Sequence, residues 1–112
     1  MATINKQEFE ATDVELAEFA RVMGHPGRIA ILKTLAERNE CVCGEIVDVL
    51  PLAQATVSQH LKELKKMGLV QGRISGVKSC YCINWEGFER FTNAMQQYID
   101  KMNQLKKIGT CC

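Results

Sequence analysis

The chain has 112 residues, a length typical of one domain, and a formal net charge of only +1. Its hydrophobic content of 46% is enough for a small core, and no apolar run approaches the length needed to cross a bilayer. We therefore expect one domain over residues 1–112, located in the cytoplasm and without a membrane partner. Residues 1–13 also lack the apolar region of a secretion signal.

Cysteine is abundant for so short a chain, with six residues. In a reducing compartment, such cysteines more often bind metal ions or carry out redox chemistry than form a disulfide framework. They fall into three close pairs: Cys41 and Cys43, Cys80 and Cys82, and Cys111 and Cys112.

The N-terminal part of the chain predicts two helices. Thr12 and Glu15 have the spacing of a capping box, and the helix they begin has an apolar stripe that includes Leu16 and Phe19. Gly24 ends this helix, and Pro26 suits the first turn of the next. The apolar residues of the second helix are Ile29, Ile31, Leu32 and Leu35.

A helix-turn-helix unit is predicted next. Residues 41–50 have the pattern of a short third helix, with Ile46, Val49 and Leu50 inward, and Pro51 stops it. A turn of about three residues then leads to a helix at about 53–67. Two helices joined by so short a turn are typical of a helix-turn-helix.

The helix at about 53–67 has two different sides. Val57, Leu61 and Leu64 form an apolar stripe at helical spacing, whereas the opposite side has short polar residues first and lysines such as Lys62 later. Short polar side chains can reach base edges and amines can meet phosphates, so we interpret this as a recognition helix. Ala53 supplies no side-chain cap at its start, and Gly68 is the predicted C′ residue that ends it.

A β-hairpin at about 69–83 follows, with its turn at Ser75-Gly76. In its second strand, Val77, Tyr81 and Ile83 share the predicted inward face, and Lys78, Cys80 and Cys82 share the other. A hairpin after a helix-turn-helix is a wing, and we expect Arg73 and Lys78 to meet the DNA backbone or minor groove. Residues 59–78 carry five basic side chains and one acid, a local charge of 5 − 1 = +4.

Asn84 is the predicted cap of a last helix at about 85–108. Its apolar residues alternate in steps of three and four, which is a heptad seam that favours a partner helix, and we expect a twofold homodimer. The residues expected at this interface are Phe88, Phe91, Met95, Tyr98, Met102 and Leu105, with Leu16 and Phe19 of the first helix.

The predicted fold is mainly α (α+β), a winged helix-turn-helix of order α-α-α-α-β-β-α that forms a homodimer through its terminal helices. With these residues the chain resembles the arsenic-repressor family of winged-helix metal-sensing transcription factors, the ArsR/SmtB family. The residues that carry the resemblance are Gly24 to Arg28, Glu40 to Glu45, Gln54 to Lys62, and Leu69-Val70.

The resemblance implies a homodimeric repressor that binds double-stranded operator DNA when empty and leaves it when an inducer binds. The positions that match the family's base-reading residues are Gln54, Thr56, Ser58, Gln59 and His60. His60 also lies near the core stripe, so a structural role stays open. The family's Cys-x-Cys site for arsenite, antimonite, cadmium or lead matches Cys41 and Cys43, but its third cysteine corresponds to Ile46.

Thiolates select soft ions, so the expected inducer is trivalent arsenic, as arsenite or a methylated arsenical, or antimonite. Cadmium or lead is the alternative, and no catalytic cofactor is expected. The ligands are drawn from Cys41, Cys43, Cys111 and Cys112, or Cys111 and Cys112 alone hold a methylated arsenical. Cys80 and Cys82 form a second site or are bystanders.

Three other functions remain open from the sequence. A repressor that senses oxidants or reactive sulfur would need one accessible cysteine of lowered pKa. A thiol reductase is disfavoured, because the chain has no Cys-x-x-Cys pair. A metal-buffering protein would show no salt-dependent binding to promoter DNA.

Overall fold

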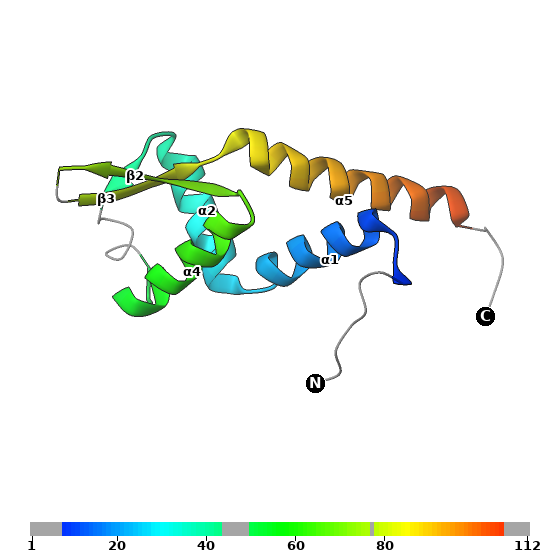
Figure 1. Ribbon diagram of the computed structural model, residues 1–112, viewed down its shortest axis with the longest axis horizontal. Helices are drawn as coiled ribbons and strands as arrows, with labels where there is room; N and C mark the ends of the chain where they lie inside the picture. Colours follow the sequence, from blue (N-terminus) through cyan, green and yellow to red (C-terminus); the bar gives the residue numbers. More distant parts are fainter. Residues whose placement is uncertain (1–7, 44–49, 77, 107–112) are drawn as a thin grey trace.

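The computed structural model describes residues 8–43, 50–76 and 78–106 (Figure 1). The helices and strands in chain order are α1 (Ala11–Met23), α2 (Pro26–Arg38), β1 (Val42–Cys43), α4 (Gln54–Lys66), β2 (Val70–Ser75), β3 (Lys78–Ile83) and α5 (Trp85–Leu105). The wing and α4 lie at one end of the molecule, and α1 and α5 extend together toward the other.

The starts of the first two helices differ in how well the sequence predicted them. Helix α1 begins at Ala11 with Glu10 as its N-cap and has no side-chain capping bond, so the predicted Thr12–Glu15 capping box is wrong. The prediction for α2 is confirmed, because Pro26 stands in its first turn. The His25 ring caps it, with Nδ1 accepting a hydrogen bond from the Gly27 backbone N–H at 3.2 Å.

The predicted hairpin is present, but it belongs to a three-stranded antiparallel sheet of order β1-β3-β2. Strand β1 pairs with β3, with Val42 opposite Tyr81 and Cys43 opposite Cys80. A helix beginning at Cys41 is therefore wrong at its start, because the backbone there is extended and hydrogen-bonded to the wing. The predicted helical residues Ile46 and Val49 lie outside the described residues.

The core lies where α2, α4 and the sheet meet. Its most deeply buried side chains include Ile31 and Leu35 from α2 and Val57 and Leu64 from α4. The apolar stripe predicted for α4 is thus confirmed. Ile29 of α2, in contrast, is exposed and lies beside Trp85.

The turn from α4 into β2 is tightly specified. Gly68 adopts a positive φ of 75°, the Gly68 N–H donates to the Lys65 carbonyl, and the Leu69 N–H donates to the Leu64 carbonyl. This pair of bonds is a Schellman motif, which ends the helix as the sequence predicted. Gly87 of α5 packs directly against the Gly68 carbonyl, so closely that a side-chain carbon there would overlap it. The turn and the start of α5 therefore fix one another.

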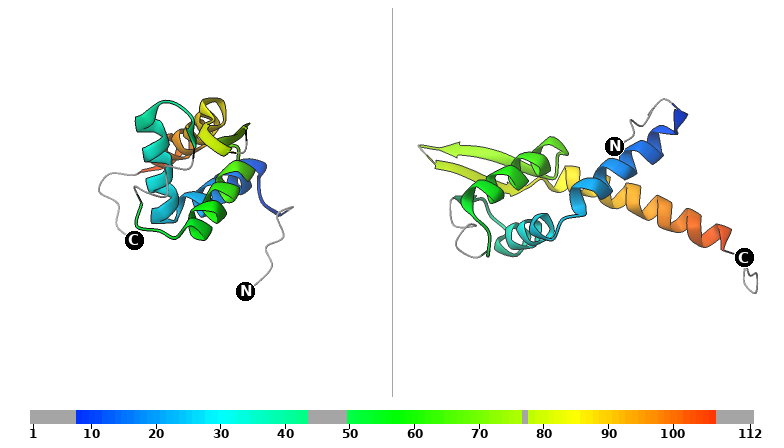
Figure 2. Two further views of the ribbon diagram at one scale, coloured as in Figure 1. Left: turned by 90° about the vertical axis from the view of Figure 1, so that its left-hand side faces the viewer. Right: turned by 90° about the horizontal axis from the view of Figure 1, so that it is seen from below.

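Helix α5 begins as predicted, with the Asn84 side chain accepting a hydrogen bond from the Gly87 N–H. It crosses α1, as Figure 2 shows in its right-hand view. The Phe19 ring of α1 lies 5.4 Å from the Phe91 ring of α5, measured between centroids. Arg90 of α5 also pairs with Glu15 of α1 at 3.4 Å. Within the described ranges, no helix is both long and apolar enough to cross a membrane.

We predict that Gly87→Ala destabilises the fold by about 2–4 kcal/mol, because the added carbon meets backbone that cannot move without disturbing the Schellman turn. Urea unfolding followed by circular dichroism measures the change. Gly72→Ala is the matched control: its added carbon would meet the end of the flexible Lys65 side chain at 3.2 Å. Equal stability of the two variants would contradict the proposed role of Gly87.

Candidate nucleic-acid interface and cysteine pairs

The side of α4 that faces away from the core is polar and exposed. Four of the predicted base-reading residues and the following lysine lie there: Gln54, Thr56, Ser58, Gln59 and Lys62. Helix α4 has no side-chain N-cap, as Ala53 predicted. Its first turn therefore offers free backbone N–H groups beside these side chains, a combination suited to contacts with DNA phosphates and base edges.

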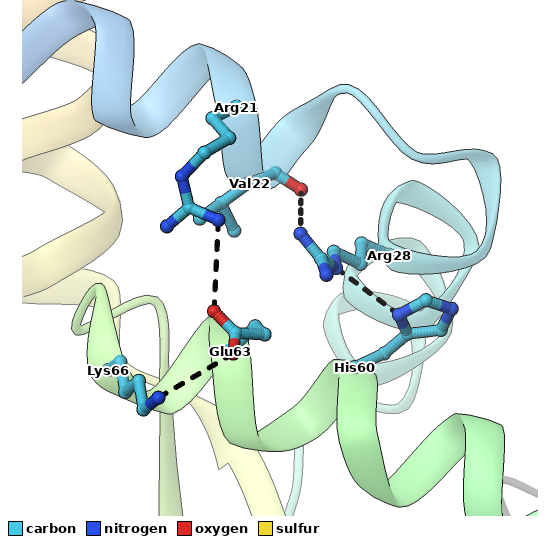
Figure 3. A network of polar contacts seen from close by, with 6 residues as sticks. All are labelled: Arg21, Val22, Arg28, His60, Glu63 and Lys66. Atoms are coloured by element: carbon cyan, nitrogen blue, oxygen red, sulfur yellow. Dashed lines mark hydrogen bonds and ion pairs between the residues drawn. The ribbon is translucent and has the colours of Figure 1, made fainter. Parts of the chain in front are cut away.

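His60 differs from its neighbours, because its side chain is only 5% exposed. Its Nδ1 accepts a hydrogen bond from Arg28 Nε at 3.2 Å, and Arg28 also donates to the Val22 carbonyl at 3.4 Å (Figure 3). The His25 ring lies edge-on to it, with a centroid distance of 4.2 Å. His60 therefore joins α4 to α2, and we correct its predicted place among the base-reading residues.

The same part of α4 is held by a second polar contact. Glu63 is paired with Arg21 of α1 at 3.9 Å and with Lys66 at 3.6 Å (Figure 3). Arg21 and Lys66 are exposed, so these pairs contribute little to stability. Together with the Arg28–His60 bond, however, they orient the inner side of α4 toward α1 and α2.

The charge state of His60 follows from these contacts. Burial lowers its pKa below the ordinary value of 6.5, and the nearby His25 and Arg28 add to the effect. Arg28 can only donate hydrogen bonds, so His60 Nδ1 must be unprotonated to accept one. The folded protein thus holds His60 neutral, with its proton on Nε2. Among the described residues, Nε2 has no hydrogen-bond partner.

The wing carries the remaining predicted DNA contacts. Arg73 on β2 is exposed, and Lys78 begins β3 opposite Ser75. Gly76 takes a positive φ of 64° in the turn between the strands. Val77, predicted to face inward, lies outside the described residues, whereas Ile83 is buried on that face as predicted.

The wing also brings cysteines together in a way the sequence reasoning missed. Because Val42 pairs with Tyr81 and Cys43 with Cys80, one further step in the register places Cys41 opposite Cys82. Cys80 is only 2% exposed and is disulfide-bonded. A hydrogen bond with the Cys41 thiol is the main cause that raises the pKa of Cys82, followed by burial, while Arg73 acts in the opposite direction.

A signal for this pairing was present in the sequence. Cys-Val-Cys and Cys-Tyr-Cys share the alternation of a strand, with a core-facing residue between two cysteines. Cys111 and Cys112 lie outside the described residues. Among the residues that the structure describes, no group of three or more potential metal ligands is gathered.

The α5 residues predicted for the dimer interface differ in how far the protomer itself covers them. Tyr98, Met102 and Leu105 are 48%, 50% and 60% exposed, and Met95 is half-buried. Phe88 and Phe91 instead pack partly against the protomer's own core. Phe19 is a correction, because α5 already buries it within the protomer.

Known proteins similar to this chain are transcriptional regulators. The family described as "Bacterial regulatory protein, arsR family" matches residues 25–71. An uncharacterised HTH-type transcriptional regulator of Methanocaldococcus jannaschii is 46% identical over 68 residues, which cover 60% of this chain and 75% of that protein. The arsenical resistance operon repressor of Staphylococcus xylosus is 32% identical over 89 residues, which cover 80% of this chain and 81% of that protein.

Solved structures agree with the fold. The homodimeric winged helix-turn-helix DNA-binding domain of a possible ArsR-family regulator from Mycobacterium bovis has a TM-score of 0.63 and 27% identity, covering 90% of this chain and 92% of that one. The fold is therefore the predicted winged helix-turn-helix. The chain belongs to the arsR family of bacterial regulatory proteins, which are transcriptional regulators and not enzymes.

The neutral state of His60 predicts a pH dependence of stability. As the pH falls below 6.5, the unfolded chain binds a proton that folded His60 does not, so the free energy of unfolding decreases. When one proton is involved, the free energy of unfolding changes by at most about 1.4 kcal/mol per pH unit. Urea unfolding at about pH 7.5 and about pH 5.5 measures this loss.

The control for this prediction is a side chain that does not titrate. His60→Asn should give a shallower dependence on pH, whereas His25→Asn should keep most of it because His25 lies on the exposed side of the pair. Identical pH slopes in the wild type and in His60→Asn would show that His60 is not held neutral.

Proposed function

We propose that this chain is a homodimeric repressor that binds operator DNA with α4 in the major groove and leaves the DNA when its cysteine thiols bind a thiophilic inducer. The observation that carries the proposal is the two-sided character of α4. Its apolar stripe is buried, and the polar residues of its first turns are exposed beside an uncapped N-terminus. We propose that residues 1–112 form one such domain, acting in the cytoplasm.

Each proposed DNA contact has a role that follows from its chemistry. Gln54, Thr56, Ser58 and Gln59 offer amide and hydroxyl groups that suit base edges in the major groove. Lys62 lies one turn further along α4, where an amine can meet a phosphate. Two further basic residues, Arg73 and Lys78, are assigned to the backbone or minor groove beside the wing.

A second copy of the chain is the proposed partner of α5. Its exposed residues Tyr98, Met102 and Leu105 continue the heptad seam beyond the part that α1 covers. The related M. bovis domain is homodimeric. A twofold dimer would present two α4 helices to two half-sites of an operator.

The proposed inducer is trivalent arsenic, as arsenite or an organoarsenical, or antimonite. One relative is named an arsenical resistance operon repressor, and thiols suit soft ions. The candidate ligands are those predicted from the sequence, Cys41 and Cys43 with Cys111 and Cys112, together with the wing cysteines. Cadmium or lead remains the alternative. The disulfide at Cys80 favours a second candidate, a repressor that responds to thiol oxidation or reactive sulfur.

The first test is fluorescence anisotropy of the reduced protein on DNA from its own promoter. We expect binding that weakens with salt and is reversed by arsenite or antimonite under anaerobic conditions. If only an oxidant or a polysulfide releases the DNA, the metalloid sensor is excluded and the repressor that responds to oxidation or reactive sulfur is supported. A protein that never binds this DNA would contradict the repressor function itself.

We predict that Lys62→Gln weakens DNA binding and reduces the salt slope by about 1 for each protomer, because one phosphate contact is lost. Anisotropy titrations at several salt concentrations give the slope. Lys33→Gln is the matched control, since Lys33 is also exposed but lies on α2. Equal effects of both changes would mean that general charge, and not α4, governs binding.

We predict that Met102→Glu dissociates the dimer, because the twofold axis would place two carboxylates in an apolar interface at a cost of several kcal/mol. Sedimentation analysis should show monomers that keep their helical circular dichroism and bind promoter DNA weakly. Gln104→Glu, on the opposite side of the exposed end of α5, is the control and should stay dimeric. A dimeric Met102→Glu variant would exclude this interface.

A further inference from the structure

The register of the sheet gathers cysteines from two distant parts of the chain onto one face. On β3, Cys80 and Cys82 are two residues apart and so share a face. Their register positions on β1 are Cys43 and, one step further, Cys41. On β2, the residues opposite Cys80 and Cys82 are Arg73 and Gln71, which are both exposed. This face of the wing is therefore exposed along β2, whereas Cys80 on β3 is buried.

One of these cross-strand pairs is open to a ligand. Cys41 and Cys82 are free thiols, both are partly exposed, and they lie at facing positions one register step beyond Val42 and Tyr81. Cys80, by contrast, is almost completely buried and already disulfide-bonded. Cys82 lies on β3, and Cys41 directly precedes β1, which the backbone ladder pairs with β3, so little ordering is required when both thiols bind one atom.

We propose that Cys41 and Cys82 form a chelating site for a trivalent arsenical with one organic substituent and two open coordination positions. This inference rests on the proposed thiophile-responsive repressor and specifies which thiols respond. Among the described side chains, two sulfurs and not three lie at this place. Arsenite takes three sulfurs, so a ligand with two open coordination positions fits this pair better.

The binding step balances without an oxidant or a reductant. The hydrated arsenical carries two hydroxyl groups on trivalent arsenic. Each thiol forms one S–As bond, and its proton leaves with one hydroxyl group as water. Two waters are released in total, the arsenic stays trivalent and keeps its organic substituent, and the sulfurs are not oxidised.

The place of the site connects it to DNA binding. Arg73 lies on the same sheet face, opposite Cys80, and it influences the pKa of Cys82 electrostatically. An aryl-arsenic group bound at Cys82 would occupy the face from which Arg73 extends. The bound ligand would therefore interfere with the wing contact proposed for Arg73, and DNA release would follow.

Phenylarsine oxide is the probe for this site. The full chain carrying Cys111→Ser and Cys112→Ser, prepared so that the Cys80 disulfide is retained, is titrated and its mass measured. We expect one aryl-arsenic group per protomer, removed by an excess of a small dithiol. In this background, Cys41→Ser and Cys82→Ser should each bind about 100-fold more weakly or worse, because a chelate becomes a single bond.

Ser79→Ala in the same background is the matched control, because it changes an exposed residue of β3 without altering a thiol or the disulfide, and it should still bind one equivalent. Circular dichroism establishes that each variant is folded, and two independent serine variants keep the test decisive if one is not. Retention of the adduct at full affinity in either Cys41→Ser or Cys82→Ser would overturn the proposal. So would the absence of any adduct once Cys111 and Cys112 are replaced.

Anisotropy on promoter DNA is measured in parallel and separates the two levels of the proposal. An adduct at Cys41 and Cys82 that releases the DNA supports both the site and the repressor function. An adduct that forms without releasing the DNA supports the site and contradicts the proposed function. The same holds for an adduct that forms on a protein that does not bind the DNA. Release that persists in both Cys41→Ser and Cys82→Ser contradicts the site and leaves the repressor in place.

Discussion

Burial of one stripe of α4 is the constraint on which the rest of the structure depends. Val57, Leu61 and Leu64 are almost inaccessible, and this fixes the rotation of the helix about its own axis. The residues on the opposite side of the helix are therefore exposed. The Schellman turn at Gly68 fixes where the helix ends and the sheet begins, and the contact of Gly68 with Gly87 fixes where α5 leaves. The outward surface of α4, the wing and α5 are thus positioned by one continuous piece of packing.

Features with a local cause could be predicted from the sequence. The stripe of α4, the turn at Gly68, Pro26 in α2 and the Asn84 cap depend on residues within a few positions of one another. Strand β1 could not be predicted in this way, because two residues form a strand only when a partner strand is present. Its partner, β3, follows α4 in the sequence, whereas β1 precedes it. The pairing of Cys41 with Cys82 was missed for the same reason, although the alternation of both segments was visible.

Other errors arose because a residue pattern shows that a side chain is apolar or polar but not what covers it. Phe19 belongs to an apolar stripe, yet it is covered by Phe91 of the same protomer and not by a second copy. His60 lies among polar residues, yet Arg28 and His25 enclose it. A neutral histidine at this place connects α4 to α2, so it contributes to the orientation of the helix whose neighbouring residues are proposed to read DNA.

The most direct test of the account is hydrogen–deuterium exchange of the protein with and without its promoter DNA. The account predicts that added DNA slows exchange at the first turns of α4 and around the turn between β2 and β3. It predicts little change in α2, which lies behind α4. Protection confined to α2 or to the exposed end of α5, with α4 unchanged, would contradict the proposal that α4 enters the groove.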